Sequence, residues 1–185
     1  MTLKYGIHWF RQDLRLENNP SLIYLSNKVE HIIPIFIFDP KTRNGSASNW
    51  WLEKSLISLS KSISLQKGKL NIFKGNPEEV FSIITKNKNI KHISWNRLYD
   101  PYSIDRDKKI KKLLFSKNVN CMTHNGYLLN EPWNIKNNSG SFYKVFTPYW
   151  RNCDEIIKKR GFEKNIQNTK FSNIKLKNFK KIKDL

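Results

Sequence analysis

Short apolar runs alternate with helical segments along the first 125 residues, and this alternation restricts the fold more than any other feature of the chain. Strands that alternate with helices form parallel sheets joined by right-handed crossovers. The second run, HIIPIFIF, is almost wholly apolar, as expected of a strand covered on both faces, although Pro34 within it predicts a strand start or a bulge. We predict an α/β fold, a Rossmann-like parallel five-stranded sheet with helices on both faces followed by an irregular linker, with strands at residues 5–9, 31–38, 70–74, 92–95 and 119–122.

Helix-start and helix-stop signals separate these runs. Asn19 before Pro20 predicts an N-cap and a short helix over residues 20–25. The segment Asn76-Pro77-Glu78-Glu79 combines a cap, a proline in the first turn and acidic residues that favour the positive end of the helix dipole. The clearest helix is predicted over residues 48–65, with Gly68 as its C-terminal stop.

The chain changes character in its C-terminal third. Residues 142–153, FYKVFTPYWRNC, are rich in aromatic side chains and show no period, and residues 154–185 hold ten basic and four acidic residues. Such a composition predicts a linker or partly disordered segment, with a short helix at residues 154–159. We therefore predict an α/β domain over residues 1–135 and an interdomain linker with a basic tail over residues 136–185.

The net charge of +19 leaves two interpretations open. A polyanionic partner such as nucleic acid would be attracted by it. However, 27 of the 34 basic residues are lysine, and the chain is rich in asparagine and isoleucine, which is also what AT-rich coding produces. The chain has no apolar run of about 18 residues, no signal segment and only two cysteines without metal-binding spacing, so we expect no membrane contact and a cytoplasmic location.

Candidate binding residues follow the predicted strands, because ligands of parallel sheets bind beyond the carboxyl ends of the strands. Arg11 would face an anionic or carbonyl-rich ligand, Asn96 offers a donor and an acceptor to a heterocycle, and Tyr99 would stack on a ring. For Arg11 and Arg15 an ion-pair network with Asp13 that braces the first loop is the alternative. No GxGxxG or Walker pattern is present, so a standard phosphate cradle is not expected. The full set of candidate cofactor-binding residues is Phe10, Arg11, Phe38, Asp39, Asn96, Arg97 and Tyr99.

Several motifs resemble, in order, segments of the DNA photolyase and cryptochrome family. HWFRQDLRLENNPSL is similar to the N-terminal signature of the family, with Glu17 where the family usually carries aspartate. Further family segments are matched between residues 5 and 153 by FIFDP, ASNWWLEKSLISLSKSI, GNPEEV, WNRLYDPYSIDRDKKIK, GYLLNEPW and YKVFTPYWRNC. The resemblance implies an N-terminal α/β domain with an antenna chromophore, which is a deazaflavin, a folate or a flavin. It also implies a helical domain that holds FAD and the DNA lesion.

The 185 residues end before that helical domain, so the resemblance implies the light-harvesting part of a deoxyribodipyrimidine photolyase-like protein. The full family enzyme is a lyase that repairs cyclobutane pyrimidine dimers in DNA under blue light. We expect this chain alone to be inactive, with no catalytic residue of its own and with FAD bound only in the missing domain. Arg106 and Asp107 are expected to be structural.

The partners that the resemblance implies are the FAD-binding helical domain, in cis or on a separate chain, and DNA in the full enzyme. The apolar segment at residues 142–150 would face the helical domain. Folate-binding relatives hold the pterin with an acidic residue near the position of Ser103, so a deazaflavin, a flavin or an empty pocket is favoured here. A cryptochrome-like photoreceptor, a free-standing module that binds a nucleotide-like ligand and a non-functional fragment are the alternatives.

Overall fold

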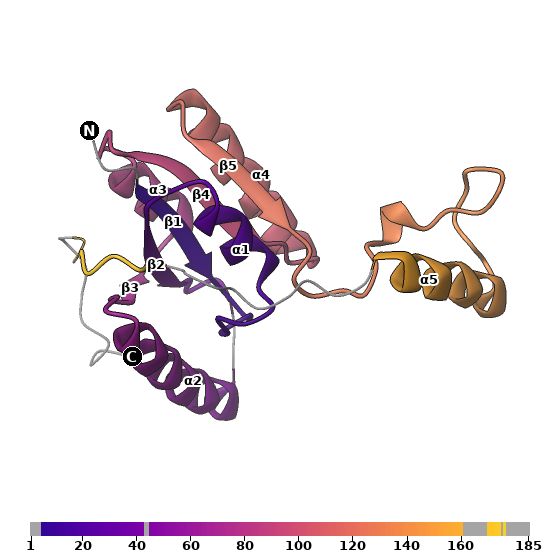
Figure 1. Cartoon of the computed structure of the whole chain (residues 1–185), viewed down its shortest axis with the longest axis horizontal. Coiled ribbons are helices and arrows are strands. Elements are labelled where there is room, and N and C mark those ends of the chain that lie inside the picture. The colour runs from indigo at the N-terminus through magenta and orange to yellow at the C-terminus, as the bar shows by residue number, and fades with distance from the viewer. Residues whose placement is uncertain (1–4, 43–44, 161–169, 175, 177–185) are drawn as a thin grey trace.

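The computed structural model of the chain describes residues 5–42, 45–160, 170–174 and 176, and it has the alternating order of elements predicted from the sequence (Figure 1). Strand and helix ends differ from the predicted ones by a few residues at most in the α/β part. The elements are β1 (Tyr5–Phe10), α1 (Pro20–Ser26), β2 (His31–Phe38), α2 (Ser46–Leu65), β3 (Asn71–Lys74), α3 (Pro77–Ile84), β4 (Ile90–Asn96), α4 (Pro101–Ser116), β5 (Asn120–His124), η1 (Pro132–Asn134) and α5 (Phe146–Arg160).

The five strands form one parallel sheet in the order β3-β2-β1-β4-β5. Central strand β1 pairs with β2 from Tyr5 opposite His31 to Phe10 opposite Phe36, and with β4 on its other side. The chain therefore moves outward from β1 through β2 to β3 and then crosses back to β4. The predicted α/β fold is confirmed, and the carboxyl ends of all five strands lie at one edge of the sheet.

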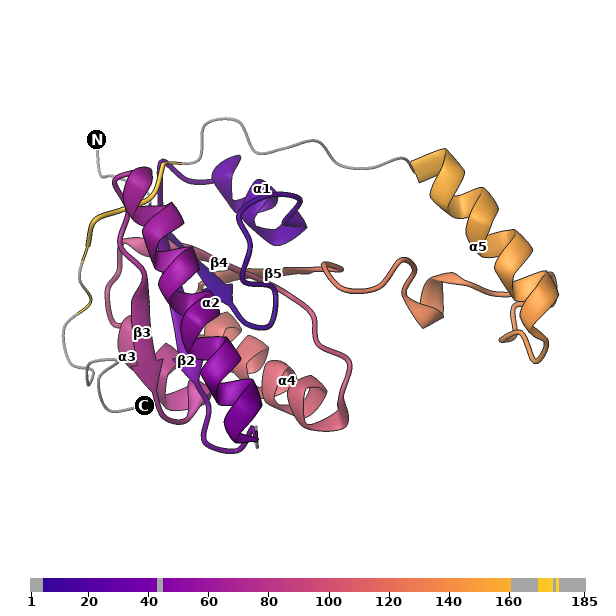
Figure 2. The same cartoon turned by 90° about the horizontal axis from the view of Figure 1, so that it is seen from below.

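Helices cover both faces of the sheet because strand side chains alternate in direction (Figure 2). Trp9 belongs to the apolar cluster that α3 and α4 cover, whereas Phe10, the next residue, belongs to the cluster that α1 and α2 cover. Both side chains are buried. The two-sided burial explains why β1 and β2 carry almost no polar residues along their length.

The end of α2 differs from the prediction. Lys67, with a φ of 59°, takes the left-handed position, and the amide of Lys67 donates to the carbonyl of Ser64 (2.9 Å) while that of Gly68 donates to Ile63 (3.0 Å). Gly68 is thus one residue beyond the conformational stop. Its lack of a side chain serves packing instead, because a Cβ atom there would collide with Phe171.

Pro34 neither starts β2 nor forms a bulge, since the register with β1 is unbroken from one side of it to the other. Its carbonyl points toward the β3 side, where Asn71 lies 3.5 Å away. Pairing with β3 begins one residue later, at Ile35 opposite Asn71. The amide hydrogen that proline lacks would therefore have faced β3 ahead of its first paired residue, and no ladder hydrogen bond is lost.

The predicted linker is more ordered than its composition indicates. Helix α5 spans Phe146–Arg160, well beyond the short helix expected at residues 154–159, and lies to one side of the α/β part (Figure 1). Phe171 returns to the sheet and is buried in the cluster under α1 and α2, where the Ser172 amide donates to Ile32 (2.7 Å). Residues 161–169 and 177–185 of the predicted tail lie outside the described residues. Within the described ranges, no helix is long and apolar enough to cross a membrane.

Candidate functional site

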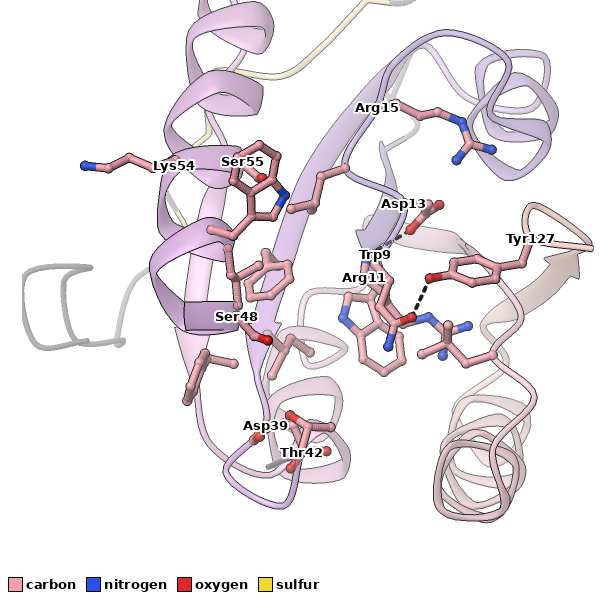
Figure 3. Close-up of a pocket in the computed structure, with 18 of the residues that line it drawn as sticks. Trp9, Arg11, Asp13, Arg15, Asp39, Thr42, Ser48, Lys54, Ser55 and Tyr127 are labelled. Atoms are coloured by element: carbon pink, nitrogen blue, oxygen red, sulfur yellow. Dashed lines mark hydrogen bonds between the residues drawn. The ribbon is translucent and has the colours of Figure 1, made fainter. Parts of the chain in front are cut away.

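A cavity of about 830 Å³ lies at the carboxyl edge of the sheet, within the range typical of small-molecule sites (Figure 3). The end of β1 and its loop supply one wall, the end of β2 supplies a second, and α2 supplies a third. Leu98, Arg106 and Tyr127 reach it from the segments that follow β4 and β5. The lining residues that carry the following argument are Trp9, Arg11, Phe38, Asp39, Trp51, Ser55 and Arg106.

The indole of Trp9 is the buried aromatic wall of this cavity. The guanidinium carbons of Arg11 and Arg106 each lie 5.0 Å from its ring centroid, within the range of a cation–π contact. Two further rings meet it edge-on, Phe81 at 5.1 Å and Trp95 at 5.5 Å between centroids. Its Nε1 atom is buried and has no hydrogen-bond partner among the described residues.

Asp107 holds both guanidinium groups in place from the first turns of α4. Its carboxylate accepts hydrogen bonds from Nη1 of Arg11 (2.8 and 3.1 Å) and from Nε and Nη2 of Arg106 (3.3 and 3.2 Å). It also accepts one from Nε1 of Trp95 (2.9 Å). Arg11 donates in addition to the carbonyl of Asn96, and burial is the main cause that lowers its pKa. A carboxylate with this many donors is fully used by the protein, so Asp107 is a structural anchor, as predicted.

Asp39, directly after β2, also holds neighbouring groups in place through hydrogen bonds and an ion pair. It accepts a hydrogen bond from the hydroxyl of Tyr102 (2.6 Å) and from the amide of Lys41 (3.0 Å), and it pairs with Arg106 at 3.4 Å. Desolvation and the hydrogen bond to Asp39 raise the pKa of Tyr102 to about 12. The tyrosine therefore stays protonated and keeps donating to Asp39 at all ordinary pH values.

The charged residues that line the cavity are largely paired within the protein. Arg11 and Arg106 share the carboxylate of Asp107, and Arg106 also pairs with Asp39. The ammonium group of Lys54 lies over the ring of Trp50 and points away from the other labelled side chains (Figure 3). The Nε atom of Arg11 is buried without a partner in the described part of the chain, as is the indole nitrogen of Trp9. The ring surfaces of Trp9, Phe38 and Trp51 in the lining suit a planar ligand.

The structure places the seven candidate residues in three kinds of surroundings: the cavity, the apolar core and two polar clusters beside the cavity. Arg11, Phe38 and Asp39 line the cavity. Phe10 is fully buried in the core under α1 and α2, and the other three belong to two polar clusters beside the cavity. The assignment of ligand-binding roles to all seven therefore remains a prediction, and the geometry favours the three that line the cavity.

One of the neighbouring clusters joins β4 to the first helix. The side-chain amide of Asn96 donates to Asp13 (2.5 Å) and to the N-cap residue Asn19 (2.8 Å), and its oxygen accepts from the amide of Ser21 (3.2 Å). A Cβ atom on Gly126 would collide with Asn96, so this corner is closely packed. Asn96 is thus occupied by the fold and presents no free edge to a ligand.

The second cluster fastens the start of the C-terminal segment to the end of β4. Arg97 forms a bidentate ion pair with Glu131, at 2.6 and 2.9 Å, and also donates to the carbonyl of Thr123. The hydroxyl of Tyr99 donates to the same Glu131 (2.7 Å), and its ring lies 5.9 Å from that of Trp133. Desolvation and the bond to Glu131 raise the pKa of Tyr99 to about 12.

Four residues that line the cavity are not among the seven predicted candidates: Trp9, Trp51, Arg106 and Tyr127. The parity of strand side chains gives a signal for Trp9, since it lies two residues before Arg11 and therefore on the same face of the sheet. Arg106 lies in the second turn of α4, so only the tertiary packing of that helix against the sheet brings it to the cavity.

A model of the DNA photolyase family matches residues 6–168. The chain belongs to the DNA photolyase family. Its relatives include a deoxyribodipyrimidine photo-lyase from Agrobacterium fabrum, 34% identical over 154 residues that make up 82% of this chain and 32% of the relative. Cryptochrome-2 of Arabidopsis thaliana is also 34% identical, over 81% of this chain and 25% of the relative. This photolyase-family chain thus spans about a third or less of the length of these curated relatives.

Solved structures of photolyases agree with this membership. A class III photolyase from Agrobacterium tumefaciens superposes with a TM-score of 0.88 and 28% identity, covering all of this chain and 38% of that protein. An archaeal photolyase from Sulfolobus tokodaii, solved with two FAD molecules that imply a novel light-harvesting cofactor, gives a TM-score of 0.74 and 26% identity over 92% of this chain and 38% of that one. The chain therefore corresponds to the N-terminal α/β part of a photolyase or cryptochrome.

Proposed function

We propose that this chain is the light-harvesting part of a photolyase-like protein, and that the cavity at the carboxyl edge of the sheet binds its antenna chromophore. The observation that carries the proposal is the cavity itself, which combines a volume of about 830 Å³ with aromatic and polar lining residues at the carboxyl edge of the sheet. When bound, the chromophore would absorb near-UV or blue light and pass the excitation to FAD in a separate helical domain. The chain itself supplies binding and orientation and no catalytic residue.

A flavin or deazaflavin fits the ring surfaces and polar side chains of the lining. Trp9, Phe38 and Trp51 offer ring surfaces to a planar heterocycle. The lining also carries polar side chains that are not buried, among them Gln12, Ser48 and Ser55, and these can bond to its carbonyl and ring-nitrogen acceptors. The archaeal photolyase with two FAD molecules supports a flavin at a light-harvesting site.

The role of the whole protein follows from the same relatives. Photolyases and plant cryptochromes match this chain equally well, at 34% identity, and the proposal concerns what they share. Repair of cyclobutane pyrimidine dimers in DNA is the function we propose for the full protein, and light signalling is the alternative.

We propose the cytoplasm as its location and the FAD-binding helical domain as the main partner of this chain. Support for that partner comes from a group of exposed apolar side chains on and just before α5, because such exposed groups mark interfaces with other domains. These side chains are Phe142, Val145, Phe146 and Trp150.

The proposal is tested by adding flavin mononucleotide (FMN), a deazaflavin and methenyltetrahydrofolate separately to the purified 185-residue chain and measuring binding by equilibrium dialysis and absorption. We expect FMN or the deazaflavin to bind with a shifted near-UV or blue absorption band. Ser55→Trp fills the cavity from α2 and should abolish binding, whereas Ser64→Trp, on an exposed part of the same helix, should not. Failure of all three ligands to bind, or equal binding by both variants, would reject the cavity as the antenna site.

A further inference from the structure

The two edges of the parallel sheet differ in charge. The amino edge is formed by the loops that lead from each helix into the next strand, at residues 27–30, 66–70, 85–89 and 117–119. These loops carry one carboxylate, Glu30, against six lysines: Lys28, Lys67, Lys69, Lys86, Lys88 and Lys117. At the carboxyl edge, the described loops carry Arg11, Arg15, Lys41 and Arg97 against Asp13, Glu17, Asp39, Asp100 and Glu131. The amino edge is therefore strongly basic, whereas the carboxyl edge is close to neutral.

Neither composition nor the helix dipole accounts for this contrast. AT-rich coding would raise the lysine content of both edges alike. Cations are favoured at helix C-termini, but that effect falls off within the last turn, and the last turns of α1, α2, α3 and α4 hold no basic residue. Lys117 alone among the six serves a helix end, because its ammonium group donates to the carbonyl of Ser82 (2.8 Å) and to Thr85 (3.1 Å) at the end of α3. The other five lysines form no such side-chain hydrogen bond in the described part of the chain.

The charges of these five lysines are available to a partner. All five side chains are exposed, and no ion pair joins any of them to a carboxylate among the residues that the structure describes. Neighbouring strands lie about 4.8 Å apart, so the five strands spread the loops along roughly 19 Å of edge. Two more exposed lysines lie beside this edge: Lys91 is the second residue of β4, and the carbonyl of Lys170 accepts from the amide of Ile32 (3.0 Å).

We infer that the amino edge of the sheet is a contact surface for duplex DNA, which it holds by the phosphate backbone without reading the base sequence. Lysine acts on phosphate as a flexible point charge, whereas base edges are read mainly by the planar fork of arginine. Along about 19 Å of duplex, one strand offers about five or six phosphates, which is comparable to the number of exposed lysines in the loops.

The arrangement of the lysines favours DNA over an anionic membrane. The loops follow one another along a single edge, which suits a linear polyanion better than a plane of lipid headgroups. Among linear polyanions, membership of the DNA photolyase family points to DNA. The surface is separate from the proposed antenna site, because the six residues of β1 put the two edges of the sheet about 20 Å apart. The inference therefore does not depend on a ligand in the cavity.

The test measures binding of a fluorescein-labelled duplex of about 20 base pairs to the 185-residue chain, by fluorescence anisotropy between about 50 and 200 mM NaCl. The amino-edge variant replaces four exposed lysines by glutamine, at Lys67, Lys69, Lys86 and Lys88. It should bind about tenfold more weakly or worse at the lowest salt concentration, and the slope of log K against log salt should be shallower by about 2–4.

A matched control variant removes the same net charge elsewhere. It replaces four exposed lysines away from the amino edge by glutamine, at Lys41, Lys136, Lys144 and Lys159. Its slope should change by less than about 1, because these lysines make no phosphate contact in the proposed complex.

The inference is overturned if the native chain does not bind the duplex at the lowest salt concentration, or if both variants lose the same affinity, since net charge alone would then explain binding. Tighter binding to phosphatidylserine vesicles than to the duplex would also overturn it. Should circular dichroism show that the amino-edge variant does not fold, the double variant Lys86→Gln/Lys88→Gln replaces it and should make the slope shallower by about 1–2. An unchanged slope in that variant counts against the inference, and no outcome of these experiments bears on the binding of FMN.

Discussion

Removal of the charge on Asp107 should destabilise the fold more than removal of any exposed carboxylate. The side chain is 10% exposed and neutralises Arg11 and Arg106, whose side chains are 4% and 5% exposed. Asp107→Asn keeps the shape but leaves Arg11 without a carboxylate partner for its guanidinium, while Arg106 retains Asp39. It also puts an amide N–H group among N–H donors. Breaking a buried ion pair by removing one partner costs about 3–5 kcal/mol, and we expect about 3 kcal/mol here because one oxygen acceptor remains.

A matched control lies two residues earlier on the same helix. Asp105 pairs with Lys108 at 3.8 Å, and these two side chains are 72% and 69% exposed. Asp105→Asn should therefore cost about 0–0.5 kcal/mol, since exposed pairs contribute little. Urea denaturation followed by circular dichroism measures both free energies of unfolding, and melting curves should show Asp107→Asn lower by roughly 6–12 °C. A cost for Asp107→Asn within about 1 kcal/mol of that for Asp105→Asn would refute the view that the arginines are desolvated and depend on it.

Three further perturbations test other parts of the structure. Burial, with the nearby charge of Arg11, lowers the pKa of His8 from 6.5 to about 3, so the unfolded chain takes up the proton first as the pH falls. Stability should drop by about 1.4 kcal/mol per pH unit below pH 6.5, measured by urea denaturation between pH 7 and pH 5. Gly68→Ala should cost about 1–3 kcal/mol in the same assay, because the new Cβ atom meets Phe171. Glu131→Gln should bring the pKa of Tyr99 down from about 12, as followed by NMR titration of labelled tyrosine.

Each of these perturbations has its own control. His8→Gln should reduce the slope between pH 7 and pH 5, and the part that remains belongs to groups such as His124, whose pKa burial also lowers. An unchanged slope would show that His8 does not cause it. Gly45→Ala introduces a Cβ atom where nothing lies within 4 Å, so it should cost less than Gly68→Ala. Glu79→Gln changes an exposed carboxylate on α3 and should leave the titration of Tyr99 as it is.

The sheet was predictable from sequence because its determinants are local. The central strands β1 and β2 are apolar runs buried on both faces, and caps such as Asn19 and Asn76 form the hydrogen bonds that their sequence context predicts. The prediction of α5 failed because proline and aromatic residues concealed its period. Pro148 lies in the first turn, where no amide donor is needed, and Tyr149, Cys153, Ile156 and Ile157 follow at helical spacing. Helices that present aromatic side chains to solvent do not show the usual contrast between faces.

The site was less predictable because its geometry depends on contacts between distant segments. Arg11 and Asp107 are 96 residues apart, and nothing in the local sequence pairs them. Phe171 is likewise placed in the core by pairing with Ile32, far along the chain, and by the space left at Gly68. Arg97 and Tyr99 lie directly after β4, where ligand-binding residues are expected. However, both side chains bond to Glu131 of a later segment and are not free to bind a ligand.

Of the two interpretations that the sequence left open for Arg11, the structure supports an ion-pair brace, but the carboxylate partner of the guanidinium is Asp107 and not Asp13. The Nη1 atom of Arg11 donates to Asp107 and its Nη2 atom to the carbonyl of Asn96, whereas Asp13 accepts only from the backbone amide of Arg11. The side chain also lines the cavity. Stability and ligand binding are therefore coupled: Asp107→Asn should lower the free energy of unfolding and, by loosening the guanidinium groups of Arg11 and Arg106, weaken the binding of FMN. A variant that lowered the free energy of unfolding and left the affinity for FMN unchanged would show that these groups have no part in the cavity.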